Sequence, residues 1–244
     1  MNFVFLDTET TGIEESDEVI QLAYVVAKDG KKTPMNKYYK PSVPITYKAM
    51  AVHHITPEKL EANNAGKLDM ADVLMRGLEK INSLDTALVA HNAKFDIDML
   101  AKHGFIPKMQ IIDTLRCARH LLDDAEGHAL GVIYYQYNLY LSMEALAREL
   151  DVDYEKLSSH DALFDVMMLI LVTRLLLRLA GSPDKLVELT FTPVMIKKFT
   201  FGKHKGELVL DVAKSDMSYL KWMLTSMKDL DEDMKFTLET VTGE

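Results

Sequence analysis

The sequence predicts an α/β protein built on a mixed sheet, with three antiparallel strands followed by parallel strands and with helices on its faces. Apolar segments rich in β-branched and aromatic residues come first and are joined by short turns. Strand and helix patterns then alternate from residue 87 to residue 122. Short turns join antiparallel strands, whereas parallel strands need a longer crossover, usually a helix. The order of the two patterns therefore predicts a mixed sheet.

The first three strands are expected at Asn2–Asp7, Glu18–Ala27 and Met35–Lys40. The first and second carry mostly apolar residues. Asp29-Gly30 lies between the second and third, and this dipeptide favours a tight hairpin turn. Pro41 ends the third strand, because proline cannot donate a hydrogen bond to a sheet. Three successive strands with short connections form an antiparallel meander.

Helical periodicity begins after Pro57, where apolar residues recur at the spacing of a helix face. Strands then alternate with helices, as parallel pairing requires. The remaining elements are predicted as a helix over 68–81, a strand over 87–90, a helix over 95–103, a strand over 110–112, and helices over 114–122, 142–150 and 161–179.

The chain is predicted to divide after Gly181, which with Ser182 and Pro183 ends the last long helix. We expect one domain over 1–181, a linker over 182–192 and a small C-terminal module over 193–244. A hairpin around two glycines (199–209) and a helix (211–227) are predicted for this module. The segment from Val194 to Trp222 contains six lysines and three acidic residues, which gives a local net charge of +3.

The composition is that of an ordinary globular protein, with 48% hydrophobic and 27% charged residues. The net charge of −9 argues against a protein that coats nucleic acid by bulk charge, but it permits an enzyme that acts on nucleic acid at one site. No apolar run is long enough for a membrane span. The one cysteine, Cys117, excludes an internal disulfide and favours a cytoplasmic location.

Asp7 and Glu9 are the first candidates for chemistry. Residues two apart on a strand point to the same face, so the two carboxylates converge at the end of an apolar strand. A divalent cation between them would offset the cost of burying both, and carboxylate oxygens suit Mg²⁺ or Mn²⁺. The alternative is that Asp7 only ends the strand and Glu9 is solvated in a turn.

Two further segments carry acidic residues and a histidine. Asp96 follows the strand over 87–90 and falls in the first turn of a helix, where an acid is also favoured by the helix dipole. Asn92 could likewise be only an N-cap. If Ser159 caps the last long helix, His160 lies at its start and Asp165 lies inside it, on an apolar surface where an unpaired carboxylate is costly.

Together these segments resemble the DEDDh family of 3′→5′ exonucleases. The resemblance is carried by Asp-x-Glu at 7–9, His-Asn-Ala-x-Phe-Asp at 91–96 and His-x-Ala-x-x-Asp at 160–165, and it covers about residues 2–180. It implies an RNase H-like fold. Residues 50–56 are similar to the family's substrate-side His-Gly-Ile-Thr segment, with His54 in place of the usual glycine.

The C-terminal module resembles that of the exodeoxyribonuclease X members of this family. The similar stretches are Phe-Thr-Phe-Gly-Lys-His-Lys-Gly at 199–206, Asp-Val-Ala at 211–213 and Tyr-Leu-Lys-Trp at 219–222. The lysines of this module could guide a DNA strand, and its aromatic residues could stack on bases or be buried against the predicted hairpin.

The resemblance implies a role for each motif position. Two divalent ions, Mg²⁺ or Mn²⁺, would be held by Asp7, Glu9, Asp96 and Asp165, and His160 would act as general base. DNA would be degraded from a 3′ end, single-stranded or frayed, to nucleoside 5′-monophosphates, in DNA repair or end processing. A homodimer is allowed without being required. Residues in positions that contact the terminal nucleotide are Thr8, Thr10, Ile13, His53, Asn92 and Phe95.

Several alternatives stay open at this point. For Ile13 and Phe95 the alternative is packing in the core. An RNA-trimming exonuclease would use the same catalytic residues, because selection rests on contacts to the 2′-hydroxyl. A polymerase-associated proofreading subunit would act largely through partner binding. A catalytically inactive binding domain is disfavoured, because all five active-site positions are filled.

Overall fold

The computed structural model describes residues 1–157, 160–227 and 229–244. The chain forms two compact units, Met1–Thr190 and Phe191–Glu244, and each is described by itself. Within the described residues, no helix combines the length and the apolar character that crossing a membrane requires.

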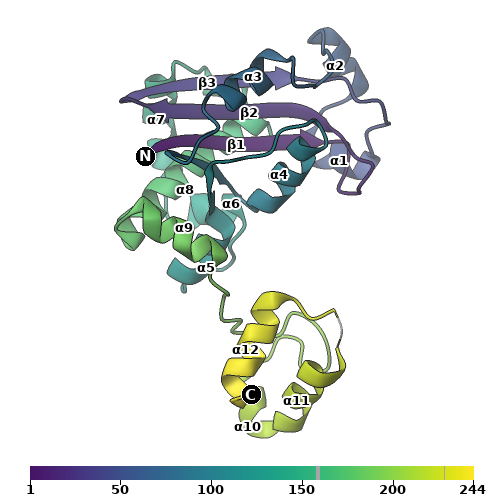
Figure 1. The fold of residues 1–244 in the computed structure, drawn as a ribbon, viewed down its shortest axis with the longest axis vertical. Helices are drawn as coiled ribbons and strands as arrows, with labels where there is room; N and C mark the ends of the chain where they lie inside the picture. The colour runs from purple at the N-terminus through teal and green to yellow at the C-terminus, as the bar shows by residue number, and fades with distance from the viewer. Residues whose placement is uncertain (158–159, 228) are drawn as a thin grey trace. The chain divides into compact units, whose positions relative to one another are not determined.

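A five-stranded mixed sheet forms the centre of the first unit (Figure 1). The spatial order is β3-β2-β1-β4-β5; β1 pairs antiparallel with β2 and parallel with β4, β2 is antiparallel to β3, and β4 is parallel to β5. This arrangement confirms the predicted fold class. The strands are β1 (Asn2–Thr10), β2 (Val19–Lys28), β3 (Lys31–Tyr38), β4 (Thr86–Ala90) and β5 (Gln110–Asp113).

The predicted tight turn joins β2 to β3. Lys28 pairs with Lys31, and the two residues between them, Asp29 and Gly30, have positive φ angles of 50° and 74°. Positive φ at both central positions defines the turn that matches the twist of a hairpin, and it explains why Asp-Gly stands there. The turn fixes the register of the meander and so places Tyr38 at the end of β3.

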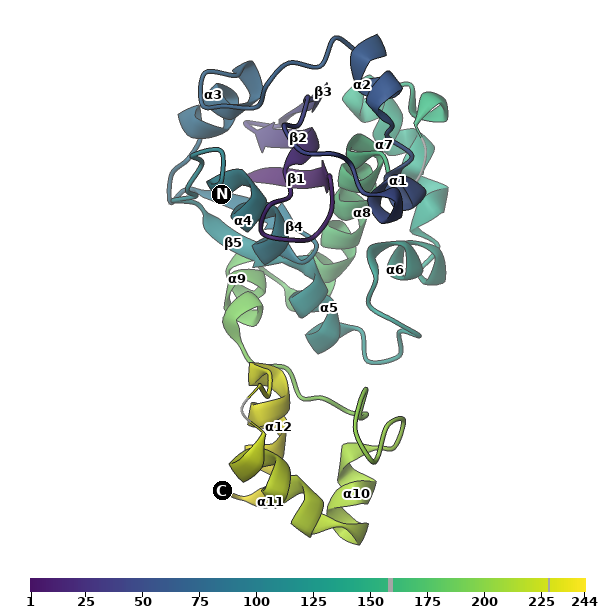
Figure 2. The same cartoon turned by 90° about the vertical axis from the view of Figure 1, so that its right-hand side faces the viewer.

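Helices cover both faces of the sheet. Figure 2 shows α7 and α8 on one side of the strands and α3 and α4 on the other. The side chains of β1 alternate between the two cores: Phe5 packs with the α8 side, whereas Val4 and Leu6 pack on the opposite face. The helices of this unit are α1 (Tyr47–His53), α2 (Pro57–Ala62), α3 (Val73–Lys80), α4 (Ala93–Ala101), α5 (Thr114–Leu121), α6 (Leu130–Gln136), α7 (Met143–Leu150), α8 (Ala162–Ala180) and α9 (Pro183–Phe191), with 3₁₀ turns at Leu139–Ser142 and Tyr154–Lys156.

The predicted linker over 182–192 is instead largely helix α9. Gly181 ends α8 with a left-handed φ of 81°, but Pro183 starts a new helix rather than an irregular segment. Leu186 and Leu189 of α9 are buried in the core of the first unit. Proline is well suited to the first turn of a helix, so the same segment that ends one helix begins the next.

The C-terminal unit is helical, with α10 (Val209–Ser215), α11 (Met217–Ser226) and α12 (Glu232–Thr242) around its own core of buried residues such as Phe199 and Leu238. In place of the two strands of the predicted hairpin (199–209), the described part of this unit shows one antiparallel bridge, between Lys198 and Leu208, that closes the loop between them. The predicted helix over 211–227 is broken at Asp216, whose side chain caps α11. Helix α12 was not predicted.

Thr190→Val tests the place of α9 in the first unit. The Thr190 hydroxyl accepts a hydrogen bond from the buried Asp113 N–H (2.9 Å), and valine leaves this donor unpaired. We expect a loss of about 1–3 kcal/mol in the free energy of unfolding, measured by urea denaturation. Thr173→Val is the matched control, because this buried hydroxyl only donates to Leu169 O in its own helix. Equal losses in the two variants would contradict the prediction.

Candidate active site

Three carboxylates of the predicted motif meet at the end of β1. Asp7 and Glu9 lie on one face of this strand, and Asp165 comes from the first turn of α8, which packs across that face. One oxygen atom from each of the three lies within 4.8 Å of the others. Oxygen ligands in this number and spacing can hold a divalent metal ion. The structure therefore brings together residues from opposite ends of the first unit's sequence.

Asp96 joins this group from the first turn of α4. The residue is only 4% exposed, and Thr8 Oγ1 donates a hydrogen bond of 2.6 Å to its Oδ1. Asp96 is not one of the three residues whose oxygen atoms lie within 4.8 Å of one another. Of the neighbouring carboxylates, however, it has the largest effect in raising the pKa of Asp7. Thr8, predicted to contact the substrate, thus holds one of the acids.

The pKa values of all four acids lie above the ordinary range. Burial is the main cause in each case, and the charges of neighbouring carboxylates add to it for Asp7, Glu9 and Asp165. Burial raises the pKa of Glu9 to about 8 and those of Asp96 and Asp165 to about 7. Carboxylates that resist ionisation in this way are ready to exchange their protons for a cation. The donor set therefore fits a hard divalent ion.

His160 lies beside this cluster, just outside α8. Its side chain is 53% exposed, and its Nδ1 is 4.0 Å from Asp165 Oδ2. The predicted cap, Ser159, lies outside the described residues, but the structure shows that Asp161 caps α8 by accepting a hydrogen bond of 3.0 Å from Leu163 N. His160 is therefore held at the start of the helix, with its ring free to reach across the site.

A cleft of about 800 Å³ opens next to Glu9. Five of the six residues predicted to contact the substrate line it: Thr8, Thr10, Ile13, His53 and Phe95. The sequence reasoning missed Tyr47 and Lys48 of α1, which line the cleft together with Val52 of the predicted substrate-side segment 50–56. The side chains of Ile13 and Tyr47 are 82% and 89% exposed, so packing in the core is excluded for Ile13.

His53 lies in the wall of the cleft and is fixed by two hydrogen bonds. It is buried, its Nδ1 accepts a hydrogen bond from Ile55 N (2.9 Å), and its Nε2 therefore donates to Thr10 O (3.1 Å). Burial lowers its pKa, which keeps the ring neutral. His54, which replaces the family's usual glycine, ends α1 with a left-handed φ of 56°. Glycine adopts this conformation without strain, which explains the usual residue at this position.

Asn92 does not reach the cleft. It occupies the N-cap position of α4 with φ of 72°, but its side chain makes no capping hydrogen bond. Asp113, at the end of β5, caps the helix instead by accepting hydrogen bonds from Asn92 N (3.1 Å) and Ala93 N (3.0 Å). Asn92 thus stands at the N-cap position, as the alternative predicts, but Asp113 rather than its own side chain makes the capping hydrogen bonds. An aspartate at the carboxyl end of a strand was the signal that could have identified Asp113.

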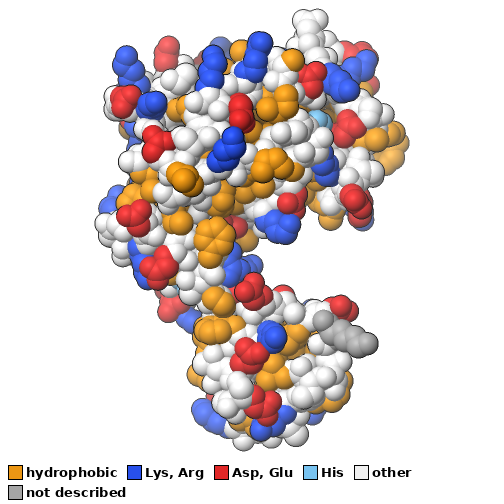
Figure 3. Space-filling model, viewed as in Figure 1, with side chains coloured by type: hydrophobic (Ala, Val, Ile, Leu, Met, Phe, Trp, Pro, Cys, Tyr) orange, Lys and Arg blue, Asp and Glu red, His pale blue; other side chains and the backbone are white. Residues whose placement is uncertain are grey.

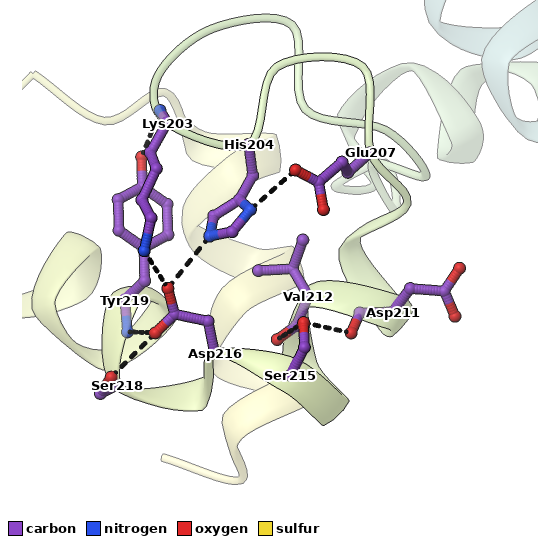
Figure 4. Close-up of polar contacts among 9 residues, drawn as sticks. All are labelled: Lys203, His204, Glu207, Asp211, Val212, Ser215, Asp216, Ser218 and Tyr219. Atoms are coloured by element: carbon purple, nitrogen blue, oxygen red, sulfur yellow. Dashed lines mark hydrogen bonds and ion pairs between the residues drawn. The ribbon is translucent and has the colours of Figure 1, made fainter.

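The C-terminal unit carries basic and acidic side chains interspersed on the face that Figure 3 draws. Figure 4 shows one polar cluster of this unit. His204 donates to Glu207 (2.9 Å) and to Asp216 (3.1 Å), and Lys203 Nζ lies 2.6 Å from the same Asp216 carboxylate. These acids raise the pKa of His204. Much of the predicted positive charge is thus balanced by ion pairs within the unit.

Known protein families match both units of the chain. A family model described as "Exonuclease" matches residues 4–173, and a second, described as "Exodeoxyribonuclease X-like C-terminal", matches residues 199–225. The chain therefore belongs to the exonuclease family, and its fold and motif are of the DEDDh type. Exodeoxyribonuclease 10 of Escherichia coli strain K12 is 31% identical over 241 residues, which cover 96% of each chain.

Other relatives share the catalytic unit or the fold. A PolC-type DNA polymerase III of Clostridium perfringens is 30% identical over 155 residues, which cover 61% of this chain and 10% of the polymerase. Exonuclease X in complex with 5′-overhanging duplex DNA superimposes with a TM-score of 0.55 at 24% identity, over 78% of this chain and 98% of that one. E. coli Exonuclease I with a dT13 oligonucleotide gives 0.51 at 18% identity, over 74% and 42%. These two structures establish the shared fold.

Asp7→Asn is expected to stabilise the metal-free protein at alkaline pH. Unfolded carboxyl groups lose their protons near pH 4, whereas the buried acids keep theirs until about pH 7–8, as the values for Glu9 and Asp165 show. Because the unfolded state binds fewer protons in this window, the contribution of the cluster to stability falls as pH rises from about 4 to about 8. The amide of the variant cannot ionise. The variant therefore does not lose the part of the stability that wild type loses when Asp7 is deprotonated.

The measurement is Tm in the presence of a chelator at pH 4.5 and pH 8.5. The Tm advantage of Asp7→Asn over wild type should be a few degrees or more at pH 8.5 and close to zero at pH 4.5. Asp98→Asn is the control, because Asp98 is exposed on α4 and paired with Lys94. If the Tm advantage of Asp7→Asn were the same at both pH values, ionisation of the buried acids would not be its cause.

Proposed function

We propose that this protein is a metal-dependent exodeoxyribonuclease that hydrolyses DNA from the 3′ end and releases nucleoside 5′-monophosphates. The observation that carries the proposal is the convergence of Asp7, Glu9 and Asp165 beside His160, at the edge of an open cleft. The names of two similar proteins, Exodeoxyribonuclease 10 and Exonuclease X in complex with duplex DNA, support DNA as the substrate.

Two divalent ions, Mg²⁺ or Mn²⁺, fit the donor set of Asp7, Glu9, Asp96 and Asp165. When bound, such ions stabilise negative charge on the attacking and leaving oxygens of a phosphodiester. The protein supplies four carboxylates, and two divalent ions would balance their charge. A negatively charged phosphate could then approach a site that would otherwise repel it.

His160 supplies the general base in this proposal. A neutral imidazole ring carries a lone pair on one of its nitrogens and can accept a proton. Because Nδ1 lies on the side of Asp165, Nε2 is the ring nitrogen that would take the proton from the attacking water. The exposure of the ring leaves room for that water and for the scissile phosphate.

The cleft would hold the 3′-terminal nucleotide. Ile13 and Phe95 present apolar side chains to it, and Thr10 and Glu9 line it as well. Apolar walls suit the faces of a base or sugar, while the phosphate would lie toward the carboxylates. A role in DNA repair or end processing and a cytoplasmic location complete the proposal. The location is proposed from the sequence's one cysteine, Cys117, which excludes an internal disulfide and suits a reducing compartment.

Asp7→Ala is expected to abolish metal-dependent degradation, because it removes a ligand from the centre of the cluster. The assay follows 5′-labelled single-stranded DNA with Mg²⁺ or Mn²⁺, with RNA of the same sequence and a chelator in parallel. Activity should fall by more than about 100-fold, while Asp98→Ala stays at the wild-type rate. A fully active Asp7→Ala protein would overturn the proposal. Faster degradation of RNA would make the protein an exoribonuclease, and inactivity of wild type on both polymers would favour a partner-dependent subunit.

His160→Ala is expected to reduce kcat by about 10²–10⁴-fold, as the loss of a general base does. Metal binding measured by calorimetry should change far less than in Asp7→Ala, because His160 stands outside the trio of ligands. A loss of metal affinity as large as that of Asp7→Ala would contradict the role of base.

The C-terminal unit is proposed to add affinity for DNA through its exposed lysines. Lys198 and Lys205 are exposed on the loop before α10. The double variant Lys198→Gln/Lys205→Gln should bind DNA more weakly at low salt and like wild type at high salt, because lysine–phosphate contacts are screened. Lys214→Gln is the control, since Lys214 is paired with Asp211. Unchanged binding of the double variant at low salt would reject this role.

A further inference from the structure

Tyr38 forms a contact with the active site that the reaction outlined above does not use. Its hydroxyl, at the end of β3, donates a hydrogen bond of 3.1 Å to Asp161 Oδ2. The other carboxylate oxygen of Asp161 caps α8 by accepting from Leu163 N at 3.0 Å. Asp161 is 7% exposed, so both hydrogen bonds are shielded from water. The first residue before α8 is thereby tied to the third strand of the sheet.

His160 depends on this tie more than Asp165 does. Asp165 lies inside α8, and its neighbours Ala162 and Val166 are buried in the core, so the helix itself fixes its position. His160 precedes the cap with a φ of 63°, a left-handed conformation that a residue other than glycine adopts only when its surroundings impose it. Its backbone N–H makes a long contact, 3.4 Å, to Asp165 Oδ1.

We propose that Tyr38 and Asp161 are positioning residues that hold His160 in place to accept the proton of the attacking water. This inference rests on the proposed function, and in particular on His160 as the general base. Neither residue touches the reacting atoms. Asp161 fixes the backbone next to His160, and Tyr38 fixes the carboxylate of Asp161.

The adjacent residue provides a matched control. The hydroxyl of Tyr39 donates a hydrogen bond of 2.8 Å to Asp72 Oδ1, and Asp72 caps α3 just as Asp161 caps α8. Tyr39 is buried in the core on the opposite face of the sheet, and Asp72 is buried at the start of α3, whose apolar residues pack in that same core. Tyr38→Phe and Tyr39→Phe thus each remove one tyrosine hydroxyl from the aspartate that caps a helix.

The experiment compares the two variants in Tm, kcat, KM and metal binding. Both should lose Tm, because each leaves a buried carboxylate with one donor fewer. Tyr38→Phe should also lose about tenfold in kcat, the size of effect expected from a slightly displaced base, with KM and calorimetric metal affinity near wild type. Tyr39→Phe should retain the wild-type kcat. Equal kcat values for the two variants would overturn the inference.

A second pair of variants guards against a general loss of structure. The amide of Asp161→Asn can still accept from Leu163 N and form a hydrogen bond with the Tyr38 hydroxyl, whereas Asp161→Ala can do neither. At saturating metal, Asp161→Asn should recover most of the kcat that Asp161→Ala loses, and equally low values would reject the inference. Wild-type protein without metal-dependent degradation would instead refute the proposed function, so the two failures are distinct.

Discussion

The burial of four carboxyl groups at one place is the constraint on which the rest of this structure depends. Asp7, Glu9, Asp96 and Asp165 come from three elements, and each alone would be easier to leave in water. The protein holds them together by placing them on rigid elements: the central strand and the first turns of two helices packed on opposite faces of the sheet. β1 is the central strand of the sheet, and both helices pack against it.

Aspartate side chains that cap helices connect strands to helices at several points. Asp72, Asp113 and Asp161 each follow or face the end of a strand, and each accepts backbone N–H groups at the start of a helix. At Asp72 and Asp161 a tyrosine hydroxyl binds the same carboxylate. A capping aspartate with a second donor fixes a helix terminus more firmly than a solvated cap, so helix starts become suitable places for functional side chains.

The parts of the fold and site that depend on local pattern were predictable, and the parts that depend on distant packing were not. The convergence of Asp7 and Glu9 follows from the period of a strand, and the turn at Asp29 follows from the conformations its residues adopt. Helix α1 was not predicted, because His53 is its one buried residue and no apolar periodicity marks it. The contribution of Tyr47 and Lys48 to the cleft therefore could not be seen from the sequence, whereas that of His53 could, through the resemblance of residues 50–56 to a substrate-side segment.

The boundary between the two units has a consequence for how such chains arise. Thr190 is bonded to β5 of the first unit, and the second unit begins at the next residue with an apolar core of its own. The core of each unit is made of residues from one side of this boundary only. A single recombination event at this point could therefore add or remove the C-terminal segment without dividing either core.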